Sequence, residues 1–265
     1  MAPCTTCWSR SGPLKTAATT AQCFSCKGSH NLGPVILGRL AACGAAIALN
    51  CLPSDQEDGR KVAEELRATG CQIEVFPADV SKGAEVRSMG ETILDRFAHI
   101  DILVHCAGPW SDTPFVELSE EDWDRILDTN LKGTYLTSQI AVPSMKRRGW
   151  GRIVVISAGS AFIRTHSIYG LAKAAIIHFV ESLAVQVAPE VTANAIAPGQ
   201  IAETTEIFEI GPSFVERAIN HTPLRRLVTR KEVAQMIELI CTSPAMNSVT
   251  GHTFVMDGGW SLHKF

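Results

Sequence analysis

A tyrosine and a lysine four residues apart are the clearest candidates for chemistry in this sequence. Tyr169 and Lys173 are separated by Gly-Leu-Ala, a spacing that places both side chains on one face of a helix. A nearby cation favours phenolate over phenol, so the pair could exchange a proton with a carbonyl oxygen near neutral pH. An exposed pair without a function has the same spacing. The catalytic interpretation is favoured because an apolar strand pattern precedes the pair at 152–157 and a long apolar helix pattern follows it.

A glycine-containing turn stands between the first predicted strand and the first predicted helix. It reads Lys27-Gly28-Ser29-His30-Asn31-Leu32-Gly33. A turn that enters a helix offers free backbone N–H groups and the positive end of the helix dipole to a pyrophosphate. Gly33 would allow the helix to pack closely on the strand, and Asn31 tolerates a left-handed backbone. Many turns share this composition, but the place of this one after the first strand favours a dinucleotide site.

The end of the second predicted strand indicates which dinucleotide would bind. It reads Leu49-Asn50-Cys51-Leu52-Pro53. A cofactor with free ribose hydroxyls usually meets an Asp or Glu here, and this stretch contains neither an acid nor an arginine. His30 in the preceding turn could face a 2′-phosphate. The sequence therefore favours NADP(H) over NAD(H).

Apolar runs alternate with helical patterns from residue 21 to the end. The runs expected to be buried strands are 21–26, 46–50, 72–76, 101–105, 152–157, 191–197 and 253–256. Ser54 and Glu57 form the pattern of a capping box for a helix that ends at Gly70, while Ser81 and Ser119 are expected to cap two further helices. Strands separated by helices need parallel crossovers. We therefore predict a single α/β domain over 21–265, with the doubly wound parallel sheet of the Rossmann fold.

The composition limits the class of protein. The 265 residues are 46% hydrophobic and 19% charged, as in an ordinary globular protein, and the formal charge of -3 gives no reason to expect nucleic acid or an anionic membrane as a partner. The most apolar stretch, 35–52, contains Arg39 and Asn50 and falls short of a membrane span. We expect a cytoplasmic protein that acts on a small molecule.

Two cysteine pairs in the N-terminal region raise the question of a metal. Cys4-x-x-Cys7 and Cys23-x-x-Cys26 are fifteen residues apart, which matches a four-cysteine zinc template. Residues three apart on a strand point to opposite faces, so Cys23 and Cys26 could not both bind one metal if 21–26 is a strand. We expect no metal, with zinc as the alternative. Residues 1–20 are expected to be a flexible extension, and an organelle transit peptide is a weaker interpretation.

Taken together, these motifs resemble the short-chain dehydrogenase/reductase family, and within it the 3-oxoacyl-(acyl-carrier-protein) reductases, over about residues 21–262. The matching segments occur in the family's order. They are Ala78-Asp79-Val80, Cys106-Ala107-Gly108, Asp128-Thr129-Asn130-Leu131-Lys132-Gly133, the Tyr169/Lys173 pair, Asn194-Ala195-Ile196-Ala197-Pro198-Gly199 and Asp257-Gly258-Gly259.

The resemblance implies hydride transfer between a nicotinamide and a carbonyl or alcohol substrate. Tyr169 would be the general acid, and Lys173 would lower its pKa and hold the nicotinamide ribose. Asn130 would hold a water that links Lys173 to solvent, and Ser157 would polarise the carbonyl. The residues that would bind the cofactor are Gly28, Ser29, His30, Asn31, Leu32, Gly33, Asp79, Val80, Ala107, Gly108, Tyr169, Lys173, Pro198, Gly199 and Ile201. The resemblance also implies a homo-tetramer or homodimer.

The departures from the family pattern leave two questions open. The position thirteen residues before the tyrosine is Ile156, whereas alignment on the preceding strand puts Ala158 in the place of the family's serine. Ser157, Ser160 or no serine could then serve. The turn at 26–33 lacks the family's threonine and two of its three glycines, and His105-Cys106 replaces Asn-Asn. The alternative is therefore a non-catalytic relative that binds a nucleotide or another ligand.

Two other segments have a functional and a plain interpretation. Residues 200–221 have the length and composition of a mobile lid, or of a solvated helix face. Lys146-Arg147-Arg148 could meet an acidic carrier protein, or could complement the C-terminus of a helix. Trp110 and Phe115 could line a pocket or belong to the core.

Overall fold

A parallel β-sheet forms the centre of the molecule. The computed structural model describes residues 20–24, 32–163, 167–204 and 211–262. Within these residues seven strands pair in the order β3-β2-β1-β4-β5-β6-β7, and every pairing is parallel. The strands are β1 Thr20–Phe24, β2 Ala46–Cys51, β3 Ile73–Pro77, β4 Ile102–His105, β5 Gly151–Ile156, β6 Val191–Pro198 and β7 Thr253–Met256. The predicted doubly wound α/β sheet is confirmed, and each strand lies within two residues of its predicted bounds.

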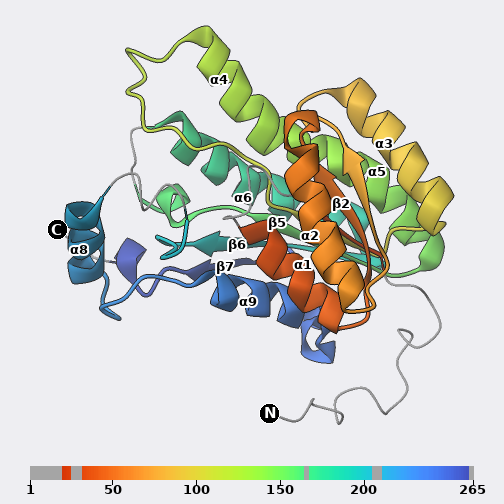
Figure 1. Cartoon of the computed structure of the whole chain (residues 1–265). Coiled ribbons are helices and arrows are strands. Elements are labelled where there is room, and N and C mark those ends of the chain that lie inside the picture. Colours follow the sequence, from red (N-terminus) through yellow and green to blue (C-terminus); the bar gives the residue numbers. More distant parts are fainter. Residues whose placement is uncertain (1–19, 25–31, 164–166, 205–210, 263–265) are drawn as a thin grey trace.

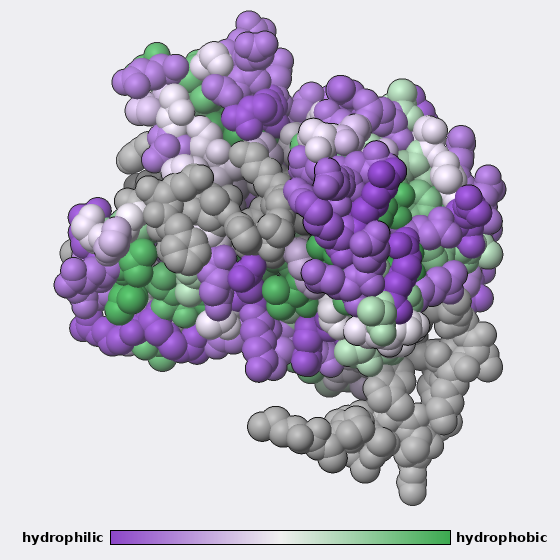
Figure 2. Space-filling view, viewed as in Figure 1, coloured by the Kyte–Doolittle hydropathy of each residue, from purple (hydrophilic) through white to green (hydrophobic). Residues whose placement is uncertain are grey.

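Helices cover both faces of the sheet (Figure 1). They are α1 Leu32–Ala42, α2 Gln56–Ala68, α3 Gly83–Phe97, α4 Glu120–Leu127, α5 Gly133–Arg148, α6 Ile168–Val187, α8 Pro212–His221 and α9 Arg230–Thr242. One core cluster holds buried residues of α3, α5 and α6, and the other holds those of α1, α2 and α9. Figure 2 shows mainly hydrophilic residues over the outward face of α2, as expected for a helix that buries only one stripe.

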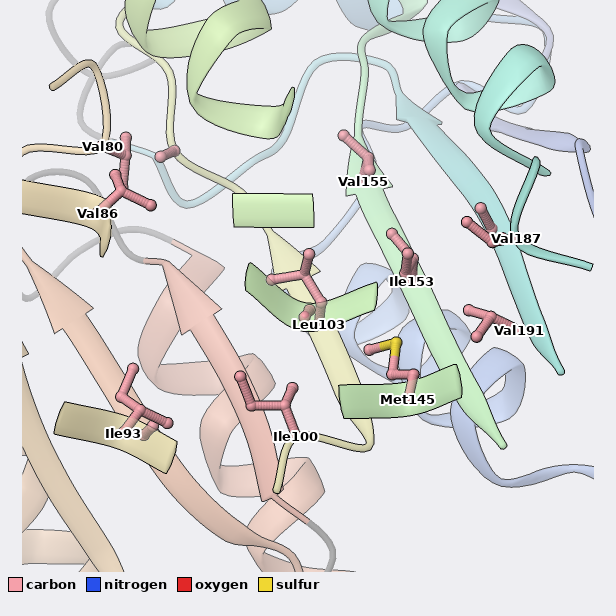
Figure 3. Packing of buried hydrophobic residues seen from close by; sticks show 14 of the residues in the cluster. Val80, Val86, Ile93, Ile100, Leu103, Met145, Ile153, Val155, Val187 and Val191 are labelled. Carbon is pink, nitrogen blue, oxygen red and sulfur yellow. The ribbon is translucent and has the colours of Figure 1, made fainter. Parts of the chain in front are cut away.

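Side-chain alternation along the strands builds these two cores. In β5, Ile153 and Val155 belong to the core cluster of α3, α5 and α6, and Figure 3 shows Ile153 near Leu103 of β4 and Met145 of α5, with Val155 further along the strand. Val154, between them, packs on the opposite face with α1 and α9. A strand with both faces buried is mostly apolar, and residues 153–156 of β5 form such a run after the buried Arg152.

The order of the strands fixes where a ligand can bind. The sheet grows in one direction from β1 to β3 and in the other from β4 to β7, so the direction of winding changes between β1 and β4. In open sheets of this kind, ligands bind at the carboxyl ends of the strands next to that change. The segments after β4, β5 and β6, and the start of α1, all lie at this edge.

Two of the three predicted helix caps are wrong. Pro53 begins a 3₁₀ turn over Pro53–Asp55, so α2 starts only at Gln56, and the Ser54 hydroxyl donates to Asp55 Oδ1 instead of capping the helix. The Ser81 hydroxyl likewise donates to Asp79 Oδ1, 2.7 Å away. In each case a neighbouring carboxylate binds the serine hydroxyl.

The remaining signals for helix ends are confirmed. Ser119 caps α4, because its hydroxyl accepts the Asp122 N–H at 3.1 Å. Gly70 follows the end of α2 with a positive φ of 88°, a backbone conformation that favours glycine.

Helix α6 is long and apolar enough by length and composition to cross a membrane. Its buried residues, which include Ile176, Val180 and Ala184, recur every three or four positions and belong to the core beneath the sheet. Packing against the sheet therefore accounts for the apolar composition of this helix.

The extension and the proposed zinc ligands fall largely outside the described residues. This holds for residues 1–19, with Cys4 and Cys7, for Cys26, and for the side chain of Cys23. The flexible extension and the zinc alternative therefore stay predictions.

A capping box fixes the start of α9, the helix that covers β5 and β6 together with α1. The Thr229 hydroxyl accepts the Glu232 N–H, and the Glu232 carboxylate accepts the Thr229 N–H. Arg226 also donates to both oxygens of Glu232, at 2.9 and 2.7 Å. The Arg226 guanidinium and the Thr229 backbone N–H lower the pKa of Glu232 to about 2.

We expect Thr229→Ala to lower the free energy of unfolding by about 1 kcal/mol, because it removes the cap hydroxyl of α9. Urea unfolding followed by circular dichroism measures this change. Thr229→Ser keeps the hydroxyl and should unfold like the wild type. Equal stability of all three proteins would show that the capping box does not hold α9.

Candidate active site

A cleft of about 360 Å³ opens at the carboxyl edge of the sheet. Its walls come from the first residues of α1, from the segments after β4, β5 and β6, and from the first turn of α6. The topology predicts a ligand site at this edge, so the cleft is where the predicted chemistry has to lie.

Tyr169 and Lys173 both line this cleft, as their spacing predicts. Ser167 caps α6 by accepting the Gly170 N–H, and Ile168 packs against Ile126 of α4. Tyr169, one position further round the helix, is half-buried and faces the cleft. Lys173 is only 3% exposed, with its Nζ 5.4 Å from the centre of the Tyr169 ring. A buried ammonium next to a phenol suits proton transfer.

The main-chain carbonyl that ends β5 holds the lysine in place. Lys173 Nζ donates to Ile156 O at 2.9 Å. In the opposite direction, Ser157 Oγ donates to the main-chain carbonyl of Lys173 at 2.8 Å. These two hydrogen bonds join the end of β5 to the first turns of α6.

The two candidate serines, Ser157 and Ser160, and Ala158, which aligns with the family's serine, all line the cleft. Ser157 lines the cleft, but its hydroxyl proton is directed to Lys173 O. Ser160 lies in a 3₁₀ turn over Gly159–Ala161, and its Oγ is shielded from solvent. Ala158, between them, has an extended backbone (φ −157°, ψ 156°) and also lines the cleft. Because Ala158 already lines the cleft, a serine at this position would place its hydroxyl in the cleft wall.

Asn130 lies one layer behind the cleft wall. It is fully buried in a π-helical turn, Asp128–Lys132, that joins α4 to α5. Its Nδ2 donates to Ile126 O at 2.9 Å and to Pro109 O at 3.2 Å. Its Oδ1 packs so closely on Gly108 that a Cβ at 108 would lie 2.0 Å from it. Asn130 therefore supports the cleft wall through Gly108.

The predicted cofactor residues fall into three groups. Those that line the cleft are Leu32, Gly33, Gly108, Tyr169, Lys173, Pro198, Gly199 and Ile201. Gly28, Ser29, His30 and Asn31 lie outside the described residues. Asp79, Val80 and Ala107 lie beyond the lining of this cleft.

The Asp79 carboxylate binds its own loop. Its Oδ1 accepts the N–H and the hydroxyl of Ser81 at 2.9 and 2.7 Å. Partial burial acts to raise the pKa of Asp79, but the hydrogen bonds from Ser81 and the charge of Lys82 outweigh it and the pKa is lowered. The carboxylate is therefore ionised and fixed in place at neutral pH.

Asn50, at the end of β2, binds the neighbouring strand. Its Nδ2 donates to the carbonyls of Phe76 and Ala78, both at 3.0 Å. The side chain is buried, so this amide stabilises the edge of the sheet. His30, which the sequence places opposite a 2′-phosphate, lies outside the described residues, so the preference for NADP(H) stays a prediction.

Comparison with known proteins decides the family. The family model for enoyl-(acyl carrier protein) reductase matches residues 29–261. The chain belongs to the short-chain dehydrogenase/reductase family.

Relatives within this dehydrogenase/reductase family match nearly the whole chain. A 3-oxoacyl-[acyl-carrier-protein] reductase of Synechocystis sp. is 33% identical over 248 residues, 92% of this chain and 98% of its own. A D-beta-hydroxybutyrate dehydrogenase of Rhizobium meliloti is 30% identical, over 93% and 98% of the two chains. The solved short-chain dehydrogenase/reductase of Serratia marcescens has a TM-score of 0.83 at 25% identity, over 92% and 98%. The predicted resemblance is confirmed, and the chain is an oxidoreductase of this family.

The sequence missed several residues of the dehydrogenase/reductase cleft. Asp112 and Trp260 line it without having been predicted, and Thr204 and Phe214 line it from the segment 200–221, for which a lid is one of the two interpretations of the sequence. Trp260 directly follows the Asp257-Gly258-Gly259 motif, which could have drawn attention to it. The motif reaches the cleft because the ends of β6 and β7 touch. A Cβ at Gly199 would come within 2.9 Å of the Asp257 backbone. Phe214 lies in α8, the described end of the predicted lid, while 205–210 are outside the described residues.

The basic cluster of this dehydrogenase/reductase lies away from the cleft. Lys146, Arg147 and Arg148 end α5, just before β5 begins, and so stand at the amino edge of the sheet. Lys146 Nζ donates to Gln186 O at 2.9 Å, and Arg148 Nε reaches Asp101 Oδ1 at 3.5 Å. These contacts support the plain interpretation, a complement to a helix C-terminus.

We expect Gly108→Ala to weaken nicotinamide-cofactor binding at least tenfold and to lower stability, because the new methyl group would displace the Asn130 amide. Fluorescence titration and thermal unfolding measure the two effects. Gly38→Ala is the matched control, since a Cβ there meets nothing within 4 Å. Binding by Gly108→Ala as tight as by the control would contradict the close packing of Gly108 on Asn130.

Proposed function

We propose that this protein is an NADP(H)-dependent carbonyl reductase with Tyr169 as its general acid and base. The observation that carries the proposal is the placement of the Tyr169 phenol and the buried Lys173 ammonium in one cleft at the carboxyl edge of the sheet. The same cleft contains Leu32 and Gly33 at the N-terminus of α1, where the helix dipole favours a pyrophosphate. Membership of an oxidoreductase family supports the assignment.

A nicotinamide cofactor fits the residues of the cleft. Gly33, Gly108 and Gly199 line the cleft without side chains and so leave room for a ligand. Pro198 and Ile201 offer apolar surface. We propose that these residues, with the turn at 28–31, hold NADP(H). The bound cofactor supplies the hydride that reduces the carbonyl carbon.

The side chains of the protein supply and control the proton. Tyr169 Oη gives its proton to the carbonyl oxygen as the carbonyl carbon takes up the hydride, so the product is an alcohol and the tyrosine is left as phenolate. The Lys173 ammonium lowers the pKa of the phenol and so stabilises that phenolate. Ser157 holds the main chain of Lys173 through its hydrogen bond, while Asn130 supports Gly108 and, in this proposal, holds a water on the path from Lys173 to solvent. The reverse sequence oxidises the alcohol.

The substrate that we propose is a 3-oxoacyl compound. The Synechocystis relative is named for a 3-oxoacyl substrate, and the Rhizobium relative for an acid with a hydroxyl group on its β carbon. Both names place the reacting oxygen on the same carbon of an acyl chain. Aromatic residues, Trp110, Phe214 and Trp260, line the cleft and would contact such a chain.

We further propose that the reductase is a cytoplasmic homodimer or homo-tetramer. An apolar groove lies beside α6 and includes Leu131 and Tyr135 of the neighbouring segments and Phe179 of α6 itself. Such a surface would support contact between copies of the chain.

One observation favours the alternative, a relative that binds a ligand without catalysis. The hydroxyl of Ser157 is engaged with Lys173 O, that of Ser160 is shielded, and Ala158 stands between them. A carbonyl in the cleft would then meet one hydrogen-bond donor fewer than in a complete site. Binding of a cofactor without turnover of any ketone would select this alternative.

We expect Tyr169→Phe to abolish reduction of 3-oxoacyl thioesters and simple ketones, because it removes the proton donor, while NADPH still binds. Fluorescence titration of the wild type with NADPH and then NADH comes first, followed by turnover of both proteins on the same substrates. Tighter binding of NADPH than of NADH would support the cofactor assignment. If Tyr169→Phe turns over these substrates as fast as the wild type, the phenol is not the proton donor.

We expect Ala158→Ser to increase kcat, by about tenfold or more, since a well-placed donor to the developing oxyanion is worth on the order of 3 kcal/mol. Ser157→Ala and Ser160→Ala are made alongside it and tested with the same substrate. Loss of turnover in either of these two variants, with no gain in Ala158→Ser, would identify the existing hydroxyl as the donor.

A further inference from the structure

His105 is a buried polar side chain next to the proposed active site. It is the last residue of β4 and is 1% exposed. Leu103, two residues earlier, belongs to the core cluster of α3, α5 and α6 and lies near Met145 of α5 in Figure 3, so alternation directs His105 to the same face of the sheet. The next residue, Cys106, lines the cleft. The imidazole therefore lies one layer behind the cleft wall.

Three segments of the chain meet at this ring. Thr137 Oγ1 of α5 lies 3.2 Å from His105 Nδ1. Main-chain groups of Thr129 and Ala107 also form hydrogen bonds with the ring. Thr129 precedes Asn130 in the π-helical turn, and Ala107 precedes Gly108. His105 thus joins the end of β4 to α5 and to the turn that carries Asn130.

The ring also lies within the electrostatic field of Lys173. Burial, followed by the positive charge of Lys173, lowers the pKa of His105 to about 3. Among the described groups, Lys173 of α6 is the charged side chain that acts on the ring. Because the pKa is lowered, protonation would occur only in strong acid. His105 therefore presents a neutral dipole to the buried ammonium at the pH of the proposed reaction.

We propose that His105 is a positioning residue for Lys173. Its ring fixes the Asn130 turn and α5 against the end of β4, so that the buried ammonium keeps one place beside Tyr169. The inference rests on the proposed function, because it assigns His105 to the same reaction. His105 stands outside the lining of the cleft and exchanges no proton with the substrate.

A purely structural histidine would stabilise the fold and leave the chemistry unchanged. The test therefore needs a readout that stability alone does not move. The pH dependence of kcat/KM provides it, because one limb of that profile reports the pKa of Tyr169. The matched control is Ser144, a buried serine of α5 that accepts the Ile100 N–H at 2.9 Å, beyond the other end of β4.

We expect His105→Phe to move the midpoint of the Tyr169 limb upward by about half a pH unit or more, because a hydrocarbon ring offers no dipole to the ammonium. A less well-held cation then favours the phenolate less strongly. His105→Asn supplies an amide dipole and should restore part of this shift. Ser144→Ala should lower the thermal midpoint without moving the limb. If His105→Phe loses stability but keeps the wild-type limb, the histidine is only structural and the proposal is overturned.

A second measurement needs neither turnover nor a folded phenylalanine variant. The histidine ring signals of the full chain are recorded by NMR, and the His105 signal is the one missing from His105→Asn. We expect this signal to stay constant between about pH 5 and about pH 9, where an ordinary histidine titrates, and to move in Lys173→Met. Titration near the ordinary value, or no response to Lys173→Met, would overturn the proposal. If the wild type reduces no carbonyl, the proposed function fails while this measurement still tests the electrostatic effect of Lys173 on the ring.

Discussion

The burial of one positive charge is the constraint to which the candidate site is adapted. Transfer of an ammonium from water into a protein core is unfavourable by several kcal/mol unless polar groups receive it. At Lys173 the carbonyl that ends β5 accepts a hydrogen bond from Nζ, and Ser157 holds the main chain of the same residue. His105 stays neutral beside it because of burial and of this charge. The cation is thereby kept next to a phenol. Because the ammonium is buried and the phenol half-buried, their electrostatic interaction is screened less than it would be in solvent.

Close backbone contacts connect the parts of the cleft to one another. Gly108 touches the Asn130 amide so closely that any side chain there would collide with it, and Gly199 touches Asp257 in the same way. The first contact joins the end of β4 to the turn between α4 and α5, and the second joins the end of β6 to that of β7. These motifs, far apart in the sequence, are therefore parts of one packed wall. The tight contacts are a reason why the wall can hold a ligand in one orientation.

Much of the fold could be read from the sequence because it depends on periodic patterns. The four residues 153–156 of β5 are buried on both faces and read as an apolar run, and Ser119 caps its helix while its hydroxyl also donates to Asp122. The predictions for Ser54 and Ser81 failed because α2 and α3 begin one residue later than expected, with Asp55 and Lys82 at the cap positions. The position of Tyr169 and Lys173 in one cleft followed from helical spacing. The direction of the Ser157 hydroxyl did not, because it depends on the main chain of α6, which the sequence does not place in space.

The π-helical turn at Asp128–Lys132 makes the site sensitive to the count of residues as well as to their identity. Helices α4 and α5 follow one another through this turn with no break in the chain. Each residue of a helix turns the chain by about 100°. The wider turn thus sets the angle between the face that buries Ile126 against α6 and the face that presents Thr137 to β4. A chain one residue shorter here would have a regular helix, and one of these two faces would rotate away from its partner. The spacing between Ile126 and Thr137 is therefore as firmly constrained as any single side chain in the cleft.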